Sequence, residues 1–589
     1  MLKYFTLVNI LNKICEEAPQ EFASYKPNPE DIEKLNQARS KAFIHLFLKV
    51  KCGVTSFKER HELITDGGQD GGIDAYFFDK ERKKLLIIQS KFRTTPENFE
   101  AKQITADDLV KMEINNILKG DSKDTNGVEY NDKIKEFQRE WSDISDQAKY
   151  EYVVIILGNI SRYNDQQIRK LIDNTKFEIF NFERTYNELV FPLCSGMYYD
   201  PKEITVTIDL FEKTEPVLEQ KISTSFGDFQ VRVIFVPIRE IGRVLLKYKN
   251  SILKYNPRNY LGLSNKFNRK IRDSILNSTS NDFAILNNGI TVIADFFNIS
   301  KSTGVVNRGQ IIMTNPQIIN GGQTAYTICK IYEDNMYNPE GLNRTFSNKE
   351  VMLKIVIVGP ETEPNIKFIQ EISNATNQQT RVEEADRRSN DGIQILLQKL
   401  IFENFGYFYE RKKGEFYYGS GSGYINKDLI IKSHEFLRSY LAFSGFPSTA
   451  RRSSSDTLFK ENNFRTVLTN VSNDFRKMLL SYLIFKYLSK IGEDETDWGL
   501  GLRYGKTAVI ASIGIDPIDD RSISTLDDMN KVIKEKVDNA RSKWLEFEKW
   551  VKENPINSAY FYKESFDFDF YYKSITLNSN IKEFFGNQN

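Results

Sequence analysis

Two strand-like segments near the N-terminus constrain the fold of this chain more than any other feature. Residues 73–78 and 84–92 alternate and then run apolar, and the polar residues DKERK separate them. Such a short polar link favours an antiparallel hairpin, whose centre we place near Glu81. A glycine-rich run, GGQDGG, leads into the first strand. The register of this hairpin then decides which side chains of the two strands meet.

Three polar side chains converge in that register. Asp74, at the start of the first strand, falls opposite about position 88, so it meets Gln89 near the end of the second strand. Gln89 and Lys91 are two residues apart and therefore share one face of their strand. The glycines before Asp74 allow a close approach of the backbone. A carboxylate, an amide oxygen and an ammonium group thus come together at one point.

This trio suits the cleavage of a phosphodiester bond. Oxygen ligands hold Mg²⁺ (or Mn²⁺), which polarises the phosphate and lowers the pKa of a bound water molecule. We expect Asp74 to be the main metal ligand, Gln89 to lend its side-chain oxygen, and Lys91 to position the water and stabilise the developing charge. The alternative is a structural hairpin with surface charges. The polar QSK that ends the apolar run LLII favours the catalytic interpretation.

The same stretch resembles the restriction-endonuclease-like superfamily, written PD-(D/E)xK. It looks most like the branch in which a G-x-D strand is followed by Q-x-K, as in Mrr-type restriction enzymes. Gln89 departs from the acidic residue of the parent pattern. The superfamily commonly adds an acidic residue from its first helix, and Glu33 is the candidate here. Because Gln89 is neutral, Glu33, Glu62, Asp66 and Asp70 all compete to be the additional metal ligand.

The 589 residues are enough for about three or four domains. Helix, strands, helix and the strand-like EYVVIILG follow one another within 1–195, which suits an α/β nuclease core. Residues 200–425 mix strand patterns with glycine and asparagine motifs, and 426–589 are mostly helical in spacing. We therefore expect an α/β multidomain chain: a restriction-endonuclease-like α/β core, a central α+β domain and a helical C-terminal region.

Charge and cysteine usage exclude several protein classes. The net charge is +1, so any nucleic-acid surface must be a local patch. The four cysteines are scattered without a CxxC pair, which argues against a structural zinc site or a disulfide framework and fits a reducing cytoplasm. No apolar run approaches the roughly 20 residues that cross a bilayer, so no membrane partner is expected. Abundant Lys, Asn and Ile hint at a bacterial cytoplasmic protein.

A second group of motifs lies at 256–324: NPRNYLG, NNGIT and INGGQT. In the last, a glycine turn joins a strand to a helix N-terminus, an arrangement that favours anions. With ATNQQTRVEEADRR (375–388) and YERKKGEF (409–416), these motifs resemble the AIPR family, named for abortive infection and phage resistance. The resemblance covers roughly 230–480. Family members often carry a restriction-like nuclease at the N-terminus.

The NGGQT motif also looks like the DGQ-type motif of ParB-like nucleotide-binding domains. That analogy implies a nucleotide or phosphate site made by Asn320, Gly321, Gly322, Gln323 and Thr324, completed by Asn288 and Arg258. The alternative is that these residues only build tight turns that organise a core. The chain lacks a GxxxxGK[ST] motif, so an ordinary P-loop ATPase is excluded.

A basic run at 411–413 is a candidate nucleic-acid contact. It comprises Arg411, Lys412 and Lys413, with tyrosines on both sides and further arginines at 387–388 and 451–452. Basic residues near aromatic rings grip nucleic acid through phosphate contacts and base stacking. The alternative is an ordinary solvated face.

The leading hypothesis is a Mg²⁺-dependent nuclease of an antiphage defence system, acting on nucleic acid, with DNA as the expected substrate. The AIPR region would sense a nucleotide, a modification or a phage-derived trigger, and the superfamily resemblance allows a homodimer. One alternative is a catalytically inactive sensor that binds DNA or a nucleotide. Another is a nucleotide hydrolase centred on NGGQT.

Overall fold

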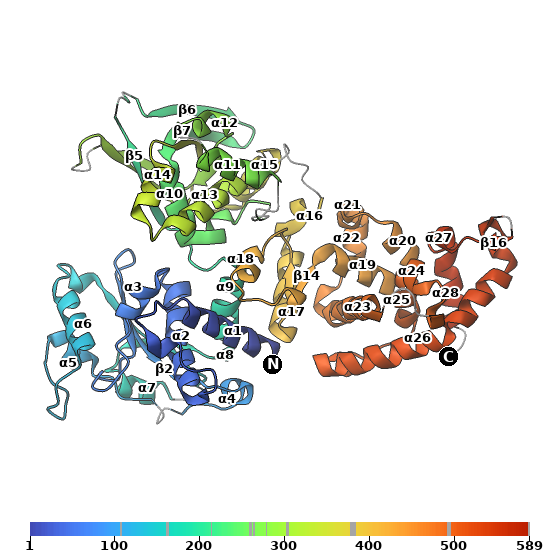
Figure 1. Cartoon of the computed structure of the whole chain (residues 1–589), viewed down its shortest axis with the longest axis horizontal. Helices are drawn as coiled ribbons and strands as arrows, with labels where there is room; N and C mark the ends of the chain where they lie inside the picture. Colours follow the sequence, from blue (N-terminus) through green and yellow to red (C-terminus); the bar gives the residue numbers. More distant parts are fainter. Residues whose placement is uncertain are drawn as a thin grey trace. The chain divides into compact units, whose positions relative to one another are not determined.

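The computed structural model divides the chain into two compact units. The first comprises Met1–Ser373 and Glu415–Lys427, and the second comprises Asn374–Gly414 and Asp428–Asn589. The structure describes every residue except 106–108, 161–163, 212, 214, 258, 260–261, 263–265, 278–279, 302–304, 377–383, 492–495, 563 and 587–589. The chain is a mixed α/β protein, rich in helix and with several small sheets, as its patterns predict (Figure 1).

The N-terminal lobe, residues 2–195 of the first unit, is built on a four-stranded sheet. Its strands are β1 (Ala75–Asp79), β2 (Lys84–Ser90), β3 (Glu151–Leu157) and β4 (Lys176–Phe180), in the order β1-β2-β3-β4. The first pair is antiparallel, while β3 runs parallel to both β2 and β4. The predicted hairpin and the buried strand EYVVIILG are therefore confirmed. The apolar run of β3 reflects its central place in the sheet.

Helices cover both faces of this sheet. On one face, Tyr76 stacks on Phe137 of α6, with ring centroids 4.4 Å apart. On the other, Phe47 of α2 meets Phe180 of β4 at 5.2 Å. The helices of this lobe are α1 (Leu2–Glu16), α2 (Ile32–Lys51), α3 (Phe57–Glu62), α4 (Pro96–Glu100), α5 (Ile114–Lys119), α6 (Asp132–Ser142), α7 (Asp165–Leu171), α8 (Phe182–Thr185) and α9 (Phe191–Ser195). The result is a three-layer α/β/α arrangement, with the buried residues on the Tyr76 face of the sheet forming one apolar core.

The central region of the first unit has two sheets and a separate core. One sheet has the order β5-β10-β9 and the other β11-β8-β12-β7-β6. The strands are β5 (Glu203–Asp209), β6 (Val217–Thr224), β7 (Gly227–Pro237), β8 (Ile290–Ala294), β9 (Phe296–Ser300), β10 (Arg308–Thr314), β11 (Gln317–Asn320) and β12 (Glu350–Ile357). The helices are α10 (Ile238–Tyr248), α11 (Lys266–Leu276), α12 (Phe283–Leu286), α13 (Gly322–Asn335), α14 (Pro339–Phe346), α15 (Glu363–Thr376) and, from 415–427, α18 (Tyr417–Gly421), with a 3₁₀ turn η5 (Lys249–Leu253) after α10.

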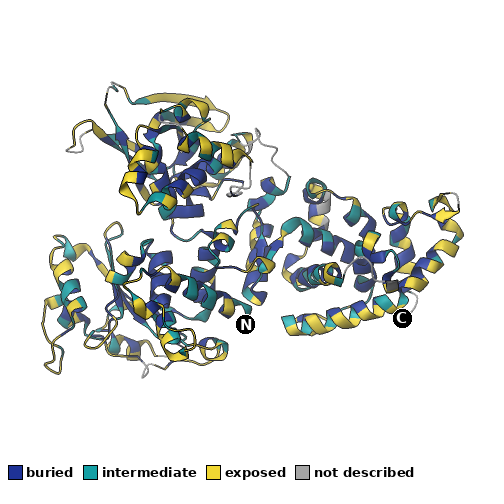
Figure 2. Ribbon diagram, in the orientation of Figure 1, coloured by how far each residue is buried: buried dark blue, intermediate teal, exposed yellow. Residues whose placement is uncertain are grey.

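The second unit is almost wholly helical, and its buried residues gather between its helices (Figure 2). Its helices are α16 (Glu384–Arg387), α17 (Gly392–Phe405), α19 (Ser433–Phe443), α20 (Pro447–Arg452), α21 (Ser455–Phe459), α22 (Glu461–Leu468), α23 (Val471–Ile491), α24 (Gly501–Tyr504), α25 (Lys506–Ile515), α26 (Leu526–Glu553), α27 (Phe568–Tyr571) and α28 (Thr576–Gly586). Its short strands are β13 (Phe408–Glu410), β14 (Ile430–Lys432), β15 (Phe561–Tyr562) and β16 (Ser565–Phe566).

The predicted central domain of 200–425 is shared between the two units. Its segment Asn374–Gly414 belongs to the helical unit, because α17 packs on α23 and Phe405 meets Phe475 with ring centroids 6.1 Å apart. Glu415–Lys427 stays with the first unit. A periodic pattern of apolar residues indicates that one face of an element is buried. It does not indicate which other element covers that face, so the sequence alone does not assign 374–414 to the second unit.

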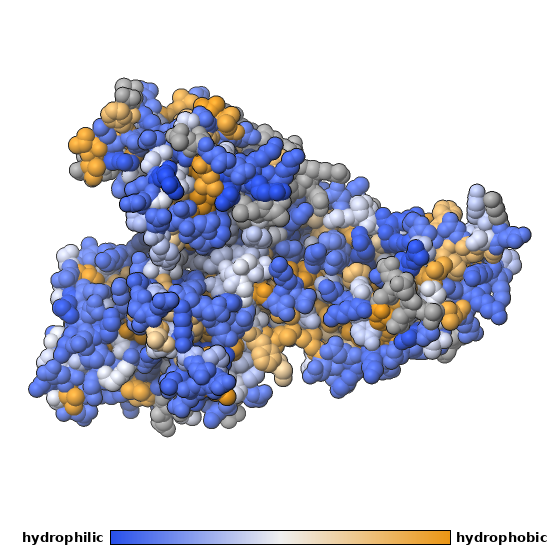
Figure 3. Space-filling view, viewed as in Figure 1, coloured by the Kyte–Doolittle hydropathy of each residue, from blue (hydrophilic) through white to orange (hydrophobic). Residues whose placement is uncertain are grey.

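The face of the molecule in Figure 3 is mainly hydrophilic, with hydrophobic residues scattered over it. The β6–β7 hairpin is among the places where large apolar side chains, including Leu218, Ile222 and Phe226, are exposed. In the part of the chain that the structure describes, no helix combines the length and apolarity needed to cross a bilayer.

Candidate active site

Three carboxylates meet beside the β1–β2 hairpin. One side-chain oxygen from each of Asp66, Asp70 and Asp74 lies within 4.8 Å of the others. Asp66 is exposed, whereas Asp70 and Asp74 are half-buried. Oxygen ligands of this kind suit a hard divalent cation such as Mg²⁺, which keeps several water ligands and needs only a few carboxylates. The residues present therefore fit the metal that the sequence implies, with Asp66 and Asp70 supplying the charge that Gln89 lacks.

The hairpin register positions Asp74. Ala75 pairs with Ile88, so Asp74 lies beside Gln89, one residue from the predicted register. The backbone N–H of Asp74 donates to the carbonyl of Ile88 at 2.9 Å, and the N–H of Ser90 donates to Asp74 Oδ2 at 2.6 Å. These bonds hold the carboxylate at the end of β1 with one oxygen already occupied.

The loop before β1 brings in the other two carboxylates. The backbone N–H groups of Thr65 and Asp66 both donate to the carbonyl of Asp74, at 2.9 and 3.1 Å, which folds this segment back onto the strand. Asp70 accepts from the N–H of Gly72 at 2.9 Å and from that of Gly67 at 3.2 Å. The cluster is thus built by backbone hydrogen bonds within a single loop.

Two glycines of the run are required by the fold. Gly72 has φ +77°, and a Cβ atom there would lie 2.6 Å from the carbonyl oxygen of Lys111. Gly71 has φ +62°, and its Cβ would lie 2.7 Å from Ile117 Cδ1. The predicted close approach to backbone is therefore found at Gly72, while Gly71 is favoured by its positive φ and approaches a side chain. A Cβ at Gly67 or Gly68 would meet no such obstacle.

Gln89 faces the loop with its amide nitrogen. Its Nε2 donates to the carbonyl of Gly72 at 2.8 Å and to that of Val110 at 3.0 Å, and the residue is 2 % exposed. Because both neighbours are carbonyls, the nitrogen must face them, which leaves Oε1 as the atom able to contact a ligand. Gln89 therefore ties the glycine turn to β2 in addition to any role as a metal ligand.

Lys91 follows β2 on the same face. Its backbone N–H donates to the carbonyl of Leu157 at 2.8 Å, so the residue continues the pairing with β3 beyond the end of the strand. Burial raises the pKa of Asp74 to about 7, helped by Asp66 and Asp70, while the Lys91 ammonium opposes the shift. The register thus places Asp74 opposite Gln89, and the Lys91 charge is near enough to act on Asp74, while the catalytic roles of the three residues stay predictions.

The remaining acidic candidates lie elsewhere. Glu33 is exposed in the first turn of α2, where it accepts a long hydrogen bond from Gln37, and Glu62 is exposed at the end of α3. Neither belongs to the group formed by Asp66, Asp70 and Asp74 among the residues that the structure describes. The structure therefore places Asp66 and Asp70, and not Glu33, beside Asp74.

A network of buried, hydrogen-bonded polar side chains anchors α3, the helix just before the acidic loop. Arg60 Nε donates to His45 Nδ1 at 3.2 Å, so the His45 proton sits on Nε2, which is 2.9 Å from the Tyr25 hydroxyl. That hydroxyl is in turn 3.1 Å from His61 Nδ1. Nothing in the local sequence pattern signals this network, because its members come from separate segments.

We expect the stability of the protein to fall below about pH 6.5 because of His45. Burial, followed by the charge of Arg60, depresses the pKa of His45 well below its ordinary value. The unfolded chain therefore binds a proton that the folded state rejects, and stability present above the unfolded pKa of ~6.5 is lost as pH falls, by up to about 1.4 kcal/mol per pH unit. His45→Gln keeps both hydrogen bonds and should flatten this slope in urea titrations between pH 7.5 and 5.5. Parallel slopes in the two proteins would contradict the prediction.

The NGGQT motif forms the predicted strand–turn–helix. Gly321 has φ +83°, and a Cβ there would lie 2.8 Å from the carbonyl oxygen of Gly289. Asn268 Nδ2 donates to Gln323 Oε1 at 3.0 Å, and Gln323 Nε2 donates to the carbonyl of Asn259 at 2.8 Å. Both ends of the glutamine amide are therefore engaged within the fold. This geometry supports the turn-building interpretation, and the phosphate-binding role stays a prediction.

One hydrogen bond of the predicted phosphate site joins the NNGIT and NGGQT motifs, and another lies within NGGQT. Asn287 Nδ2 donates to Thr324 Oγ1 at 3.3 Å, and Asn320 Oδ1 accepts from the N–H of Gly321 at 2.7 Å. Gly322 is buried at the start of α13, whereas Asn288 is exposed. Arg258 lies outside the described residues.

The basic run at 411–413 does not form the exposed patch that its sequence suggests. Arg411 is 9 % exposed, with Nε donating to Gln398 Oε1 and a guanidinium N–H donating to the carbonyl of Ser389, both at 2.8 Å. Lys412 is 1 % exposed, and only Lys413 is at the surface. The expectation of nucleic-acid contacts from Arg411 and Lys412 is wrong, because the segment after β13 turns into the unit's interior.

Comparison with known proteins identifies the larger part of the chain. Residues 253–558 match the family described as AIPR protein, which confirms the resemblance carried by NNGIT and NGGQT and extends it toward the C-terminus. No curated protein and no solved structure gave a match. The family is named for abortive infection and phage resistance, which suggests a role in antiphage defence. The chain belongs to the AIPR protein family.

Proposed function

We propose that the N-terminal lobe is a metal-dependent nuclease with a restriction-endonuclease-like fold. The observation that carries this proposal is the meeting of Asp66, Asp70 and Asp74 on the hairpin face that also presents Gln89 and Lys91. A bound Mg²⁺ would neutralise phosphate charge and lower the pKa of a water ligand. The substrate we propose is DNA.

The order of elements supports the fold assignment. An antiparallel hairpin is followed by a strand parallel to its second member, and helices cover both faces of the sheet. The acidic cluster lies near the C-terminal end of β2, which Lys91 follows directly. Side chains at the ends of sheet strands are held rigidly while remaining accessible to a large substrate.

The lysine and the carboxylates divide the chemical work. The three carboxylates would hold the metal ion, and the half-buried Lys91 ammonium would orient the attacking water and stabilise charge that develops on the phosphate. A low-dielectric environment strengthens both effects. Asp74 lies in such an environment, because its pKa is raised mainly by burial.

The AIPR region gives this nuclease a biological setting. We propose that it is a sensor or regulatory module of an antiphage defence protein, responding to a nucleotide, a nucleic-acid modification or a phage-derived component. With a separate sensor region and nuclease lobe, cleavage of nucleic acid would occur only when the sensor region detects its ligand.

A cleavage assay tests the proposal. Labelled DNA, modified and unmodified, and labelled RNA are incubated with the full chain in Mg²⁺, in Mn²⁺ and in EDTA. We expect cleavage of DNA only when metal is present, and a fall of roughly 100-fold or more in the rate for Lys91→Met. Lys102→Met, which changes an exposed lysine of the same lobe, serves as the matched control and should cleave like the wild type.

Two outcomes would defeat the proposal. Equal rates for Lys91→Met and Lys102→Met would remove Lys91 from the site. A wild-type protein that binds DNA tightly but cleaves no substrate with either metal would favour the catalytically inactive sensor.

A further inference from the structure

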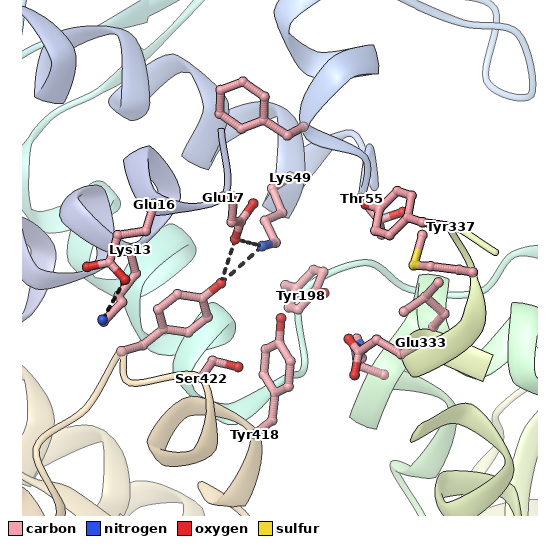
Figure 4. Close-up of a pocket in the computed structure, with 15 residues that line it drawn as sticks. Lys13, Glu16, Glu17, Lys49, Thr55, Tyr198, Glu333, Tyr337, Tyr418 and Ser422 are labelled. Carbon is pink, nitrogen blue, oxygen red and sulfur yellow. Dashed lines mark hydrogen bonds and ion pairs between the residues drawn. The ribbon is translucent and has the colours of Figure 1, made fainter. Parts of the chain in front are cut away.

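A large cavity of mixed polar and apolar lining lies in the first unit, apart from the acidic cluster. Its volume is about 540 Å³, and α1, α2, the 3₁₀ turn η5, α13 and the segment around α18 all contribute to its lining (Figure 4). That volume is within the ~300–1,000 Å³ range of small-molecule sites and far exceeds the ~30 Å³ of one water molecule. The cavity therefore has room for a ligand of nucleotide size.

Lys49 is one of two buried cations in the cavity. It is 6 % exposed, and its Nζ donates to Glu17 Oε1 at 2.6 Å and to the Tyr424 hydroxyl at 3.0 Å (Figure 4). Glu17 is also bound by Arg60, at 2.5 Å through its other oxygen. Lys49 and Arg60 thus share one carboxylate, so Glu17 does not neutralise Lys49 alone.

Lys249 is the second buried cation. It is 4 % exposed, and its contact with Glu333 is long, at 3.3 Å between Nζ and Oε1. Its Nζ also lies 5.1 Å from the centre of the Tyr418 ring. Burial alone would lower the pKa of this lysine, but the nearby Cys329 thiol, followed by Glu333 and Tyr326, outweighs burial and raises it. Lys249 therefore presents a charged ammonium group with three N–H donors in the cavity, and its hydrogen bond to Glu333 is long.

The backbone at Lys249 is strained. Its φ is +46° with ψ −129°, a region that residues with a Cβ rarely adopt. The following residue fixes this turn: Asn250 Nδ2 donates to the carbonyl of Ser195 at 2.6 Å, and the Asn250 N–H donates to that of Gly196 at 2.9 Å. Strain of this kind at a non-glycine residue persists only where the surrounding structure enforces it, and strained residues gather at ligand-binding sites.

Aromatic side chains complete the lining. Figure 4 shows Tyr198 between Lys49 and Glu333, and the charges of both Lys49 and Lys249 act on its hydroxyl. Tyr337 is 83 % exposed and belongs to the lining, so its ring is free to stack on a flat group at the rim. Buried ammonium groups suit phosphate oxygens, and an exposed aromatic ring suits a base.

We propose that this cavity binds a phosphorylated small molecule of nucleotide size, with its phosphate between Lys49 and Lys249 and its base against Tyr337. The lining comes from both the N-terminal lobe and the AIPR region, so a bound molecule would contact both. The proposal does not depend on the nuclease activity of Asp74. Inorganic phosphate shares the same anionic chemistry and is distinguished by the experiment.

Thermal unfolding of the full chain tests the proposal. ATP, AMP, inorganic phosphate and adenosine are titrated in EDTA with the Asp74→Asn variant, so that no metal-bound nucleotide can occupy the acidic cluster. We expect ATP or AMP to raise Tm in a concentration-dependent way, and adenosine to bind at least about tenfold more weakly. Phosphate acting as strongly as AMP would identify free phosphate as the occupant. No shift with any probe, or equal shifts with AMP and adenosine, would overturn the proposal.

Three variants assign the effect to the cavity. Lys249→Gly removes the cation but suits the positive φ, so it should fold and lose at least about tenfold in affinity, whereas the neighbouring Lys247→Met should respond like the parent. Tyr337→Ala, at an exposed position, should weaken AMP but not phosphate. If Lys249→Gly and Tyr337→Ala both bind AMP like the parent, the assignment fails.

Discussion

Replacing Asp74 by asparagine is expected to abolish metal-dependent cleavage while raising the Tm of the metal-free protein. Loss of a carboxylate at the centre of the acidic cluster should reduce the cleavage rate by roughly 10²–10³-fold or more. Asparagine keeps an oxygen that can accept the hydrogen bond from the Ser90 N–H, so the hairpin should be preserved.

The gain in stability follows from the raised pKa of Asp74. Burial, with smaller contributions from Asp66 and Asp70, raises it to about 7 in the folded protein. The unfolded chain ionises this carboxyl near pH 4, so the folded state loses stability as pH rises from there toward 7. Asparagine removes that loss, and we expect a gain on the order of 2 kcal/mol at pH 8 in EDTA.

Cleavage rates and thermal unfolding of the same preparations test both halves of this prediction. Asp121→Asn, at an exposed position of the same lobe, is the matched control and should change neither quantity. A variant that loses cleavage but also unfolds at lower temperature would show that Asp74 serves the fold more than the reaction. Full activity in Asp74→Asn would end its assignment as a metal ligand.

Replacing Arg60 by methionine is expected to destabilise the protein by about 3–5 kcal/mol. Arg60 is fully buried and donates to His45 Nδ1, to the carbonyls of Val54 and Thr55 at 3.0 and 2.7 Å, and to Glu17 Oε2. Methionine is of similar length but satisfies none of these acceptors. Removing one member of a buried charged network leaves the others without compensation.

Urea unfolding at pH 7.5 measures this effect. Lys58→Met is the matched control, because Lys58 lies on the same short helix and pairs with Glu21 at the surface, with both side chains more than half exposed. Its unfolding midpoint should stay close to that of the wild type, since exposed ion pairs contribute little. Equal midpoints for the two variants would show that the Arg60 network is not a stabilising element of the lobe.

The candidate site was predictable where it depends on strand alternation. A period of two residues places Gln89 and Lys91 on one face, and the four-residue link 80–83 sets the register that brings Asp74 opposite Gln89. The choice among the competing carboxylates was not predictable in this way. Asp66 and Asp70 reach Asp74 because a glycine loop folds back onto β1. Glu33 lies on a helix whose position the local pattern does not fix.

The basic run at 411–413 illustrates the opposite case. Three consecutive cations predict a solvated or ligand-binding face, yet Arg411 and Lys412 are both buried, and Arg411 donates to residues of α17 and of the turn before it. A charged residue in the sequence indicates that its burial would cost free energy. The sequence does not show whether the fold supplies hydrogen-bond partners that offset this cost. The partners of Arg411 lie 13 and 22 residues away along the chain.

The sequence by itself determined the local structures: the hairpin with Asp74, Gln89 and Lys91 on one face, and the strand–turn–helix at NGGQT. Both follow from short-range periodicity and from the backbone freedom of glycine. Tertiary structure alone decided which carboxylates join Asp74, how Arg60 and His45 are satisfied, and that Lys49 and Lys249 line one cavity. Those arrangements join residues far apart in the chain, such as Lys49 and Tyr424, whose meeting depends on how whole elements pack.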